Sequence, residues 1–332
     1  MTAAAPSFDQ EADDRETIDG QANASLPAAA SRIPNVFNAL ILIAQVAAVF
    51  AFLRGAAVVT SIGLLILLSA AFAVFMMSVF SSIHEAEHGT LFSNEQANAI
   101  GGIIASSFFP APFHLLRQGH IGHHLRNRSD DEAFDFWFDG ESPAWKWVQW
   151  IGILTGFFYV MVVLSNVIVL GLPFLLKRRW FAFDRPSAAF MDSINPRYAR
   201  IIQAEACGII VLHGLMIWLM RIPIGHYLAL YGAFGFLWSA MQYVHHYATE
   251  RHITRGARNL WIFWPIDKLW LNHNWHRLHH LHPTVSWIHL NRLGKQTGDD
   301  RRFLPWAYLK MWAGPRKAKE NVRNRFAGKI IR

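Results

Sequence analysis

Long uncharged runs alternate with polar segments along this chain. The first run extends from Val36 to Leu53, and after Arg54 a second extends from Gly55 to Ile83. A helix needs about 20 apolar residues to cross the roughly 30 Å of hydrocarbon in a bilayer. Both runs are therefore predicted transmembrane helices, and the single residue between them predicts a helical hairpin.

Further uncharged or nearly uncharged runs follow, and one of them is interrupted by proline. The runs without such an interruption extend from Val148 to Leu176, from Ile201 to Met220 and from Ile222 to about Tyr247. The run from Ala99 to Leu116 contains two prolines, which break helices, so we expect a re-entrant or interfacial segment there. The pattern predicts an all-α polytopic membrane protein with about four transmembrane helices plus re-entrant or interfacial helices.

The composition agrees with a membrane protein and suggests three regions. Of the 332 residues, 53% are hydrophobic and only 16% are charged, whereas soluble proteins carry about 25% charged residues. Residues 1–33 are rich in Ala, Ser, Asp and Glu and are expected to form a disordered acidic tail, not a cleavable signal peptide. We expect a membrane-embedded catalytic domain over residues 34–315 and a basic tail over residues 316–332.

The distribution of charge predicts the orientation in the membrane. Lys and Arg exceed Asp and Glu by 8, and basic residues concentrate in residues 177–200 and 295–332. Cytoplasmic loops are rich in Lys and Arg, so both segments should face the cytoplasm, and the net charge then needs no nucleic acid. An acidic ferredoxin-like donor and anionic lipid are equally good partners for the basic C-terminal region. Several tryptophans flank the apolar runs, where interfacial anchoring and ordinary packing are equally good explanations: Trp145, Trp147, Trp150, Trp261, Trp264, Trp270 and Trp287.

The 17 histidines gather in short clusters at the ends of the apolar runs. His84 and His88 are four residues apart and therefore share one helix face. The triplet His120, His123 and His124 has the same property, and it recurs as His276, His279 and His280. A pair, His245 and His246, follows the last apolar run. Single histidines at a membrane boundary are common, but this repetition of ligand spacing predicts a metal site in a cytoplasmic histidine-rich cap.

The ligand chemistry narrows the choice of metal. The single cysteine, Cys207, excludes a thiolate cluster and an internal disulfide. Three or four protein ligands usually satisfy one zinc ion, so eight or nine imidazoles suit two metal ions. Iron is the natural candidate for oxygen chemistry, with copper and zinc left open by ligand type alone.

These motifs resemble the three histidine boxes of the membrane fatty acid desaturase superfamily, which also includes hydroxylases and carotenoid ketolases. The resemblance covers roughly residues 40 to 290, and the sequence around each of the last two boxes, including Asp130-Asp131 and the run from Trp275 to Pro283, agrees with it. It implies two iron ions held by nine histidines: His84, His88, His120, His123, His124, His246, His276, His279 and His280. His246 is assigned by its position before the last box, with His245 as its rival. Gln242 stands where some desaturases have an asparagine that holds a metal-bound water, so its role is left open.

The remaining polar residues of these segments have two explanations each. Five acids could accept the second N–H of a ligating imidazole or be solvated charges at helix ends: Glu85, Glu87, Asp130, Asp131 and Asp135. Glu205 is left out of the site, as an ion pair with Arg200. Packing or simple hydrogen bonds are expected for His114, His213, His226 and His289, and ligation is also not expected for His252, His273 and His282.

The clusters can meet at one centre only if they lie on one side of the bilayer. An even number of crossings must then separate the second box from the last, but three apolar runs lie between them. We expect the run from Val148 to Leu176 not to cross, because Lys177, Arg178 and Arg179 follow it. It should be re-entrant, broken near Gly171 and Pro173, or lie along the interface.

The resemblance implies an O2-dependent diiron oxidoreductase that introduces a double bond into a long-chain fatty acyl group. Electrons would come from a separate ferredoxin-, rubredoxin- or cytochrome b5-like protein, and an apolar tunnel among the spans would hold the acyl lipid. The expected location is the bacterial inner membrane, with the site facing the cytoplasm. The alternatives are a lipid or carotenoid hydroxylase or ketolase, slightly favoured by Trp287, and, remotely, a membrane metal-binding or transport protein, which should place its ligands near the bilayer midplane.

Overall fold

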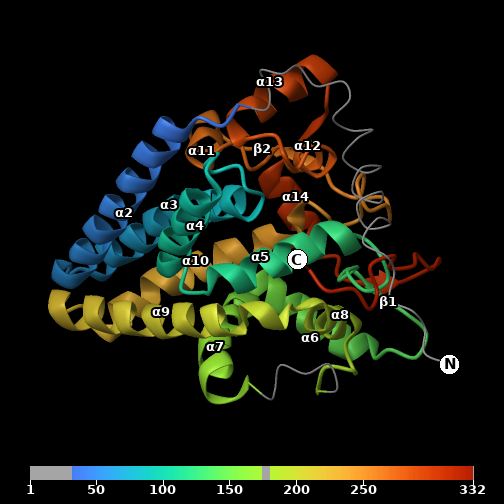
Figure 1. The fold of residues 1–332 in the computed structure, drawn as a ribbon, viewed down its shortest axis with the longest axis horizontal. Helices are drawn as coiled ribbons and strands as arrows, with labels where there is room; N and C mark the ends of the chain where they lie inside the picture. The colour runs from blue at the N-terminus through green and yellow to red at the C-terminus, as the bar shows by residue number, and fades with distance from the viewer. Residues whose placement is uncertain (1–31, 174–179, 332) are drawn as a thin grey trace.

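The computed structural model of the chain describes residues 32–173 and 180–331, and it is mostly helical (Figure 1). The acidic tail predicted for residues 1–33 therefore lies almost entirely outside the described residues, as do Lys177, Arg178 and Arg179. The helices are α2 (Asn35–Val58), α3 (Ile62–Glu87), α4 (Glu95–Phe108), α5 (Phe113–Arg126), α6 (Pro143–Thr155), α7 (Phe157–Gly171), α8 (Arg185–Ser193), α9 (Ala199–Met220), α10 (Ile224–Val244), α11 (Trp264–Leu269), α12 (His276–Leu281), α13 (Trp287–Thr297) and α14 (Leu304–Met311), with a 3-10 turn, η4, at Pro196–Tyr198.

Four short strands form two parallel pairs outside the long helices. Strand β1 (Phe136–Trp137) pairs with β4 (Arg316–Lys317), and β2 (Asn259–Trp261) pairs with β3 (Arg301–Phe303). Each pair joins segments that are far apart in the sequence. They tie the polar C-terminal part of the chain to the loops between the helices.

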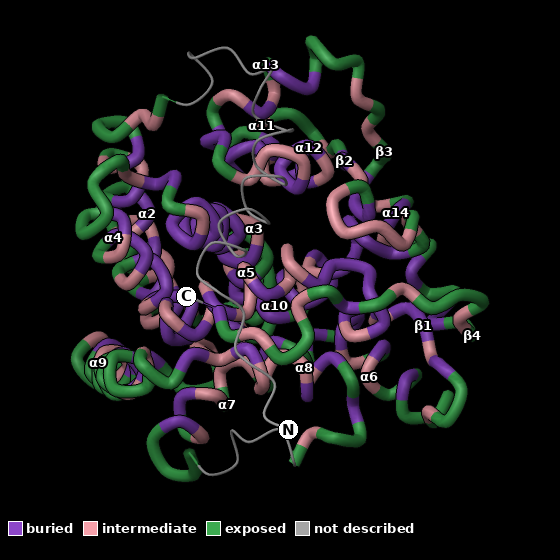
Figure 2. Tube along the Cα trace, turned by 45° about the vertical axis from the view of Figure 1, so that its right-hand side comes forward, coloured by how far each residue is buried: buried purple, intermediate pink, exposed green. Residues whose placement is uncertain are grey.

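Three helical segments are long and apolar enough to cross a membrane: α2, α3 and the segment from η4 through α9. The number rises to five if each of two bent helix pairs is one span, so the range includes the four spans expected. The predicted hairpin is present as α2 and α3. Helix α10 has 21 residues, no charged side chain and many aromatic residues and glycines, and it is packed against α3 at the centre of the molecule (Figure 2).

Both apolar runs that were expected to be interrupted form bent helix pairs. Helices α4 and α5 meet at 101°, around the segment that contains Pro110 and Pro112, and α6 and α7 meet at 90°. The second bend lies at Gly156, which was not predicted, whereas α7 ends at Gly171, where a break near Gly171 and Pro173 was expected. Gly156 adopts a left-handed φ of 93°, and a Cβ there would lie 2.9 Å from the backbone of Phe236. Only glycine makes this turn against α10 without strain.

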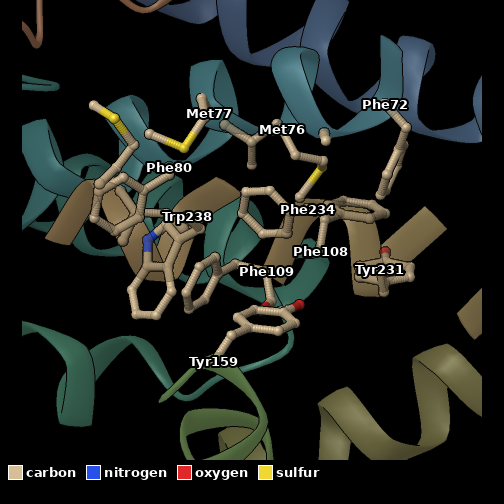
Figure 3. Close-up of a cluster of buried hydrophobic side chains, with 14 of the residues drawn as sticks. Phe72, Met76, Met77, Phe80, Phe108, Phe109, Tyr159, Tyr231, Phe234 and Trp238 are labelled. Carbon is tan, nitrogen blue, oxygen red and sulfur yellow. Dashed lines mark hydrogen bonds between the residues drawn. The ribbon is translucent and has the colours of Figure 1, made fainter. Parts of the chain in front are cut away.

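An aromatic cluster fills the space between α3, α10 and the bends. Phe80 of α3 packs edge-on against Trp238 of α10 at 5.6 Å between ring centroids, and Phe109 packs against the same indole at 4.9 Å. Tyr159 of α7 reaches Phe109 from the other side, at 5.5 Å (Figure 3). The C-terminal half of α3 is buried over its whole circumference, so it carries the first histidine box into the protein interior and away from lipid.

Candidate metal centre

The histidine boxes meet because the elements that carry them end at the same place. The last turn of α3 carries His84 and is followed by His88, and α5 carries the second box. The short helix α12 carries the last box. His246 follows the end of α10. Segments separated by more than 150 residues thus place imidazoles side by side. This is the arrangement expected if all of the clusters lie on one side of the bilayer.

One group of five histidines comes from all three boxes: His84, His88, His120, His124 and His279. Each offers a ring nitrogen, and the five nitrogens all lie within 4.8 Å of one another. The Nε2 atoms of His88 and His120 are 2.7 Å apart, and His124 Nε2 lies 3.1 Å from both His120 Nε2 and His279 Nε2. The nitrogens therefore converge on one point.

A second group of four adjoins the first: His123, His246, His276 and His280. His246 Nε2 lies 3.2 Å from His123 Nε2 and 3.0 Å from His276 Nε2. The rings of His124 and His280 stack with centroids 4.2 Å apart, which joins the two groups. Among the described residues, these groups contain the nine predicted histidines and nothing else.

The donor geometry fits metal ions. Imidazole nitrogen binds a divalent transition metal at about 2.0–2.1 Å, so two ligands at right angles around one ion lie about 3.0 Å apart. The nitrogen pairs above have this spacing. His84 Nε2 is buried without a hydrogen-bond partner, and a buried polar atom without a partner is costly unless something binds it. An all-nitrogen set in two groups suits a diiron site.

Burial keeps the histidines of the last box in the form that binds metal. Desolvation, with smaller contributions from neighbouring imidazoles, lowers the pKa of His276, His279 and His280 well below the ordinary value of 6.5. The pKa of His246 is lowered in the same way. Neutral imidazoles have a free lone pair, so protons do not compete with a metal at neutral pH.

The outer nitrogens of some histidines are held by acceptors. His246 Nδ1 lies 2.8 Å from the Gly256 carbonyl, which fixes the tautomer that leaves Nε2 free to bind. His123 Nδ1 lies 3.3 Å from Glu132 Oε1. Burial alone would raise the pKa of Glu132, but Arg126 and His123 together lower it below its ordinary value. The sequence predictions did not include Glu132, although it extends the acidic run whose first two members were considered.

Of the five acids that were considered as partners of histidine, only Glu87 lies near one. Its Oε2 is 3.8 Å from His120 Nδ1. Glu85 accepts hydrogen bonds from Thr90 and from the backbone of Trp287. The aspartates are not solvated charges either, because each binds side chains elsewhere.

The three aspartates organise the loop after α5. Asp135 is buried and binds Arg128 at 2.5 Å and the Tyr243 hydroxyl at 2.8 Å. Asp130 binds Arg251 at 2.5 Å, and Asp131 accepts from Asn324 at 2.9 Å. Neither of the two explanations left open for them, an imidazole partner or a solvated charge, therefore applies to these three aspartates. Their bonds hold the loop after the second box in place against other parts of the chain.

Two further histidines, His245 and His273, lie close to the nine but belong to neither group. His245 Nδ1 lies 3.2 Å from the Arg258 carbonyl, and its ring faces His276 at 4.5 Å. His273 lies 4.7 Å from His84, ring to ring. Gln242 donates to the Trp238 carbonyl of its own helix at 3.2 Å, which gives it an ordinary structural contact.

The four isolated histidines make simple hydrogen bonds, as predicted. His213 pairs with the Ser107 carbonyl and the Tyr227 hydroxyl, His226 with the Ala56 carbonyl and His289 with the Arg32 carbonyl. His114 binds Glu205 at 2.5 Å. The prediction that Glu205 pairs with Arg200 was wrong. The bend between α4 and α5 brings the helix that carries the second box, α5, against α9, so that His114 is the partner of Glu205.

The tryptophans divide between the two explanations considered for them. Trp150, Trp270 and Trp287 are buried and packed, whereas Trp145, Trp147, Trp261 and Trp264 are exposed. The Trp287 indole donates to Asn38 at 3.0 Å.

Fold and site together define a helical membrane enzyme built around histidine groups suited to two metal ions. The sequence profile of the fatty acid desaturase family matches residues 60–315, and the chain belongs to this family. No curated protein matches the chain significantly. The resemblance stated from the histidine boxes is thereby confirmed, and membership implies a lipid substrate.

Proposed function

We propose that this protein is an O2-dependent diiron desaturase that introduces a double bond into a long-chain fatty acyl group. The observation that carries the proposal is the convergence of nine imidazoles in two adjoining groups at the ends of membrane-embedded helices. The overall change removes two hydrogens from adjacent carbons; these two hydrogens, O2, two electrons and two protons together give two waters. A separate donor protein of the ferredoxin, rubredoxin or cytochrome b5 type would supply the electrons.

The chain's own residues would hold and orient two iron ions. His84, His88, His120, His124 and His279 form one ligand set, and His123, His246, His276 and His280 form the other. Bound iron would supply the activation of dioxygen that C–H oxidation needs. The Gly256 carbonyl and Glu132 orient ligand rings, and the surrounding protein excludes water from the neutral imidazoles.

The aromatic cluster is the best candidate for the acyl-binding region. Phe80 lies 5.7 Å from the ring of His273, which itself contacts His84. An apolar path therefore begins beside the first ligand group and continues between α3 and α10 through Met76 and Met77 (Figure 3). Methionine is unbranched and adaptable, so these side chains can move when an acyl chain enters. The expected tunnel would be formed here.

The membrane that we propose is a bacterial inner membrane, and exposed basic residues in the C-terminal part of the chain support a cytoplasmic orientation of the site. Arg302, Lys317 and Lys319 are exposed on the cap side of the chain. Basic residues concentrate on the cytoplasmic side of membrane proteins. An acidic electron donor and anionic lipid both fit such a surface.

The alternatives lose support from the contacts described. Trp287, which slightly favoured a hydroxylase or ketolase, is occupied in packing the last box onto α2 and α3 through Asn38 and Glu85. A transporter should hold its ligands near the membrane midplane, whereas here the ligands lie at and beyond helix ends. Desaturation is therefore the function that we propose.

Lipid analysis of cells that express the protein tests the proposal. Fatty acids with new double bonds and no added oxygen are expected, and they should be absent with His124→Ala, a variant that removes one ligand. His114→Ala is the matched control, because it removes an imidazole outside both groups. Oxygenated lipid or pigment in place of new double bonds would refute desaturation in favour of the hydroxylase alternative. Active protein purified without iron would refute the diiron centre itself.

A further inference from the structure

Residues 316–331 are bonded along the loop that follows the second histidine box. The Arg316 amide donates to the Asp135 carbonyl at 3.0 Å, in the β1–β4 pair. Asp130 and Val322 exchange two hydrogen bonds, both at 2.8 Å, through the Asp130 amide and carboxylate. The segment predicted as a basic tail is therefore an ordered part of the cap.

The far end of this segment packs behind the second-box helix. The Ile331 amide donates to the Ser193 carbonyl at 3.0 Å, and Asn195 donates to the Ile331 carbonyl at 3.1 Å. Only 2% of Ile331 is exposed. A Cβ at Gly122, which lies between His120 and His123, would come within 2.9 Å of Ile331 Cδ1. The isoleucine thus presses against the face of α5 opposite to the ligands.

A polar contact chain leads from the same place to a ligand. Arg126 is buried beside Gly122, where the added Cβ would lie 2.7 Å from its Nη1. Arg126 donates to the Ser193 hydroxyl at 3.1 Å and to Glu132 Oε2 at 3.3 Å. The other oxygen of Glu132 faces His123 Nδ1 at 3.3 Å. One carboxylate therefore connects a fixed arginine to a predicted ligand of the second group.

We propose that Glu132 is a positioning residue for His123, and that residues 316–331 hold it in place by packing Ile331 behind Gly122 and Arg126. The inference rests on the proposed two-metal site. A ring fixed at Nδ1 presents Nε2 at a defined angle, and loss of such an outer partner typically weakens metal binding 10- to 100-fold. The effect should be confined to the four-histidine group, because Glu132 contacts none of the other five imidazoles.

Cobalt binding to the metal-free full-length protein tests the inference. Wild type should bind two Co2+ ions, counted by visible absorption during titration against a competing chelator. Glu132→Gln should bind one ion with wild-type affinity and the second about 10- to 100-fold more weakly, and Glu132→Asp should fall between them. Glu205→Gln is the matched control, because it changes a carboxylate–imidazole contact whose histidine, His114, belongs to neither group, and it should leave both affinities unchanged.

Ile331→Ala tests the packing part of the inference without touching a polar group. It should weaken the same ion selectively, with a smaller effect than Glu132→Gln, and alter the cobalt spectrum of that site alone. Two ions bound by Glu132→Gln with wild-type affinities would overturn the positioning role. Equal weakening of both ions in Ile331→Ala would show a general loss of structure and overturn the role of the segment. A wild-type protein that binds no metal would instead overturn the proposed function.

Exposed apolar side chains, aromatic with one exception, gather outside the candidate spans. They are carried by β2, β3, α11, α14 and the residues next to them, which lie on one side of the molecule (Figure 2). The most exposed are Trp261, Phe263, Trp264, Phe303, Trp306, Leu309 and Trp312, with 43% to 70% of each residue accessible. We call these seven residues the aromatic face.

The aromatic face is continuous with a candidate membrane segment. Trp261 and Phe303 are in contact at 4.6 Å. Helix α14 is fixed to α6 by a hydrogen bond from the Trp150 indole to the Met311 carbonyl at 2.8 Å. Helix α6, the first half of a bent pair, itself exposes Val148 and Ile151 to the outside.

We infer that the aromatic face lies in the interfacial layer of the bilayer and sets the depth of the cap. Tryptophan is enriched at this layer, and Lys310, which lies over the Trp306 ring at 5.8 Å, is suited to bind lipid phosphates there. The occupant is lipid and not a partner protein, because the surface runs on directly into residues of a membrane segment.

Spin-label accessibility in nanodiscs tests this placement. Cys207 is the only cysteine, so a Cys207→Ser background accepts single labels, such as Trp264→Cys and Trp306→Cys. Both labels should relax more with oxygen than with an aqueous nickel chelate, and Lys319→Cys should show the reverse. Chelate access at residues 264 and 306 equal to that at 319 would overturn the inference.

Discussion

Adjacent histidines after α10 provide the sharpest test of the site. His246 and His245 are both buried, but only His246 belongs to a metal-binding group. His246 contributes one of four nitrogens, and its Nε2 lies within 3.2 Å of both His123 and His276. Substitution of His246 by alanine should therefore remove a ligand, whereas substitution of His245 should not.

The expected loss of metal affinity can be scaled from the effect of residues that only orient a ligand. Loss of a residue that merely orients a ligand costs about 10- to 100-fold in metal affinity, so loss of the ligand itself should exceed 100-fold, or about 2.8 kcal/mol. His246→Ala should bind one ion tightly and the other at least about 100-fold more weakly. His245→Ala should keep both, although the cavity it leaves will lower thermal stability.

Metal content of the purified variants, followed by chelator competition, measures the difference. Each variant needs a thermal unfolding profile, so that loss of an ion is separated from loss of fold. Two tightly bound ions in His246→Ala, together with loss of one in His245→Ala, would refute the assignment. It would place His245 in the second group, through its Nε2 atom, which is buried without a hydrogen-bond partner while Nδ1 faces the Arg258 carbonyl.

Three further predictions concern the scaffold. Gly156→Ala forces a side chain into a left-handed backbone against Phe236, so the free energy of unfolding should fall by about 1–3 kcal/mol; Gly171→Ala, with open space around it, should not cause this loss, and equal effects in thermal unfolding would contradict the argument. Asp135→Asn leaves the buried Arg128 without its carboxylate and should cost about 3–5 kcal/mol, so a change below 1 kcal/mol in denaturant unfolding would show that the pair is not needed. The stability of the metal-free protein should be highest above pH 6.5 and fall as the pH drops below it, because His276, His279 and His280 take up protons in the unfolded chain but stay neutral when buried in the fold. Each of these histidines contributes about 1.4 kcal/mol per pH unit to the loss. A flat pH profile of stability from pH 7 to pH 5 would contradict the lowered pKa values.

The histidines that meet in the two groups could be picked out from the sequence because their signal is local. Four-residue and three-residue spacings place imidazoles on one helix face, and the ends of uncharged runs show where those faces lie along the chain. The sequence does not separate His246 from its neighbour His245, since both have the same local surroundings. The choice depends on which ring points toward His123 and His276, which is a matter of tertiary structure.

The hydrogen-bond partners of these histidines could not be predicted in the same way. The Gly256 carbonyl that holds His246 is a backbone atom, and every residue has one. The nearby aspartates have the right chemistry for histidine but are drawn instead to buried arginines. Proximity in sequence shows that several acidic residues lie near the second box, but not which of them faces an imidazole. Glu132, which faces His123, was not among the residues considered.

The positions of the bends show the same division between local and tertiary information. Two prolines identify the break between α4 and α5 because their effect on a helix is local. Gly156 carries no comparable signal, since an isolated glycine within an apolar run is common. Its role depends on the backbone of Phe236, 80 residues away, which leaves no room for a Cβ. That the histidine boxes must lie on one side of the bilayer is enough to argue for an even number of crossings between the second box and the last. The residue at which the chain turns is instead determined by the packing of α7 against α10.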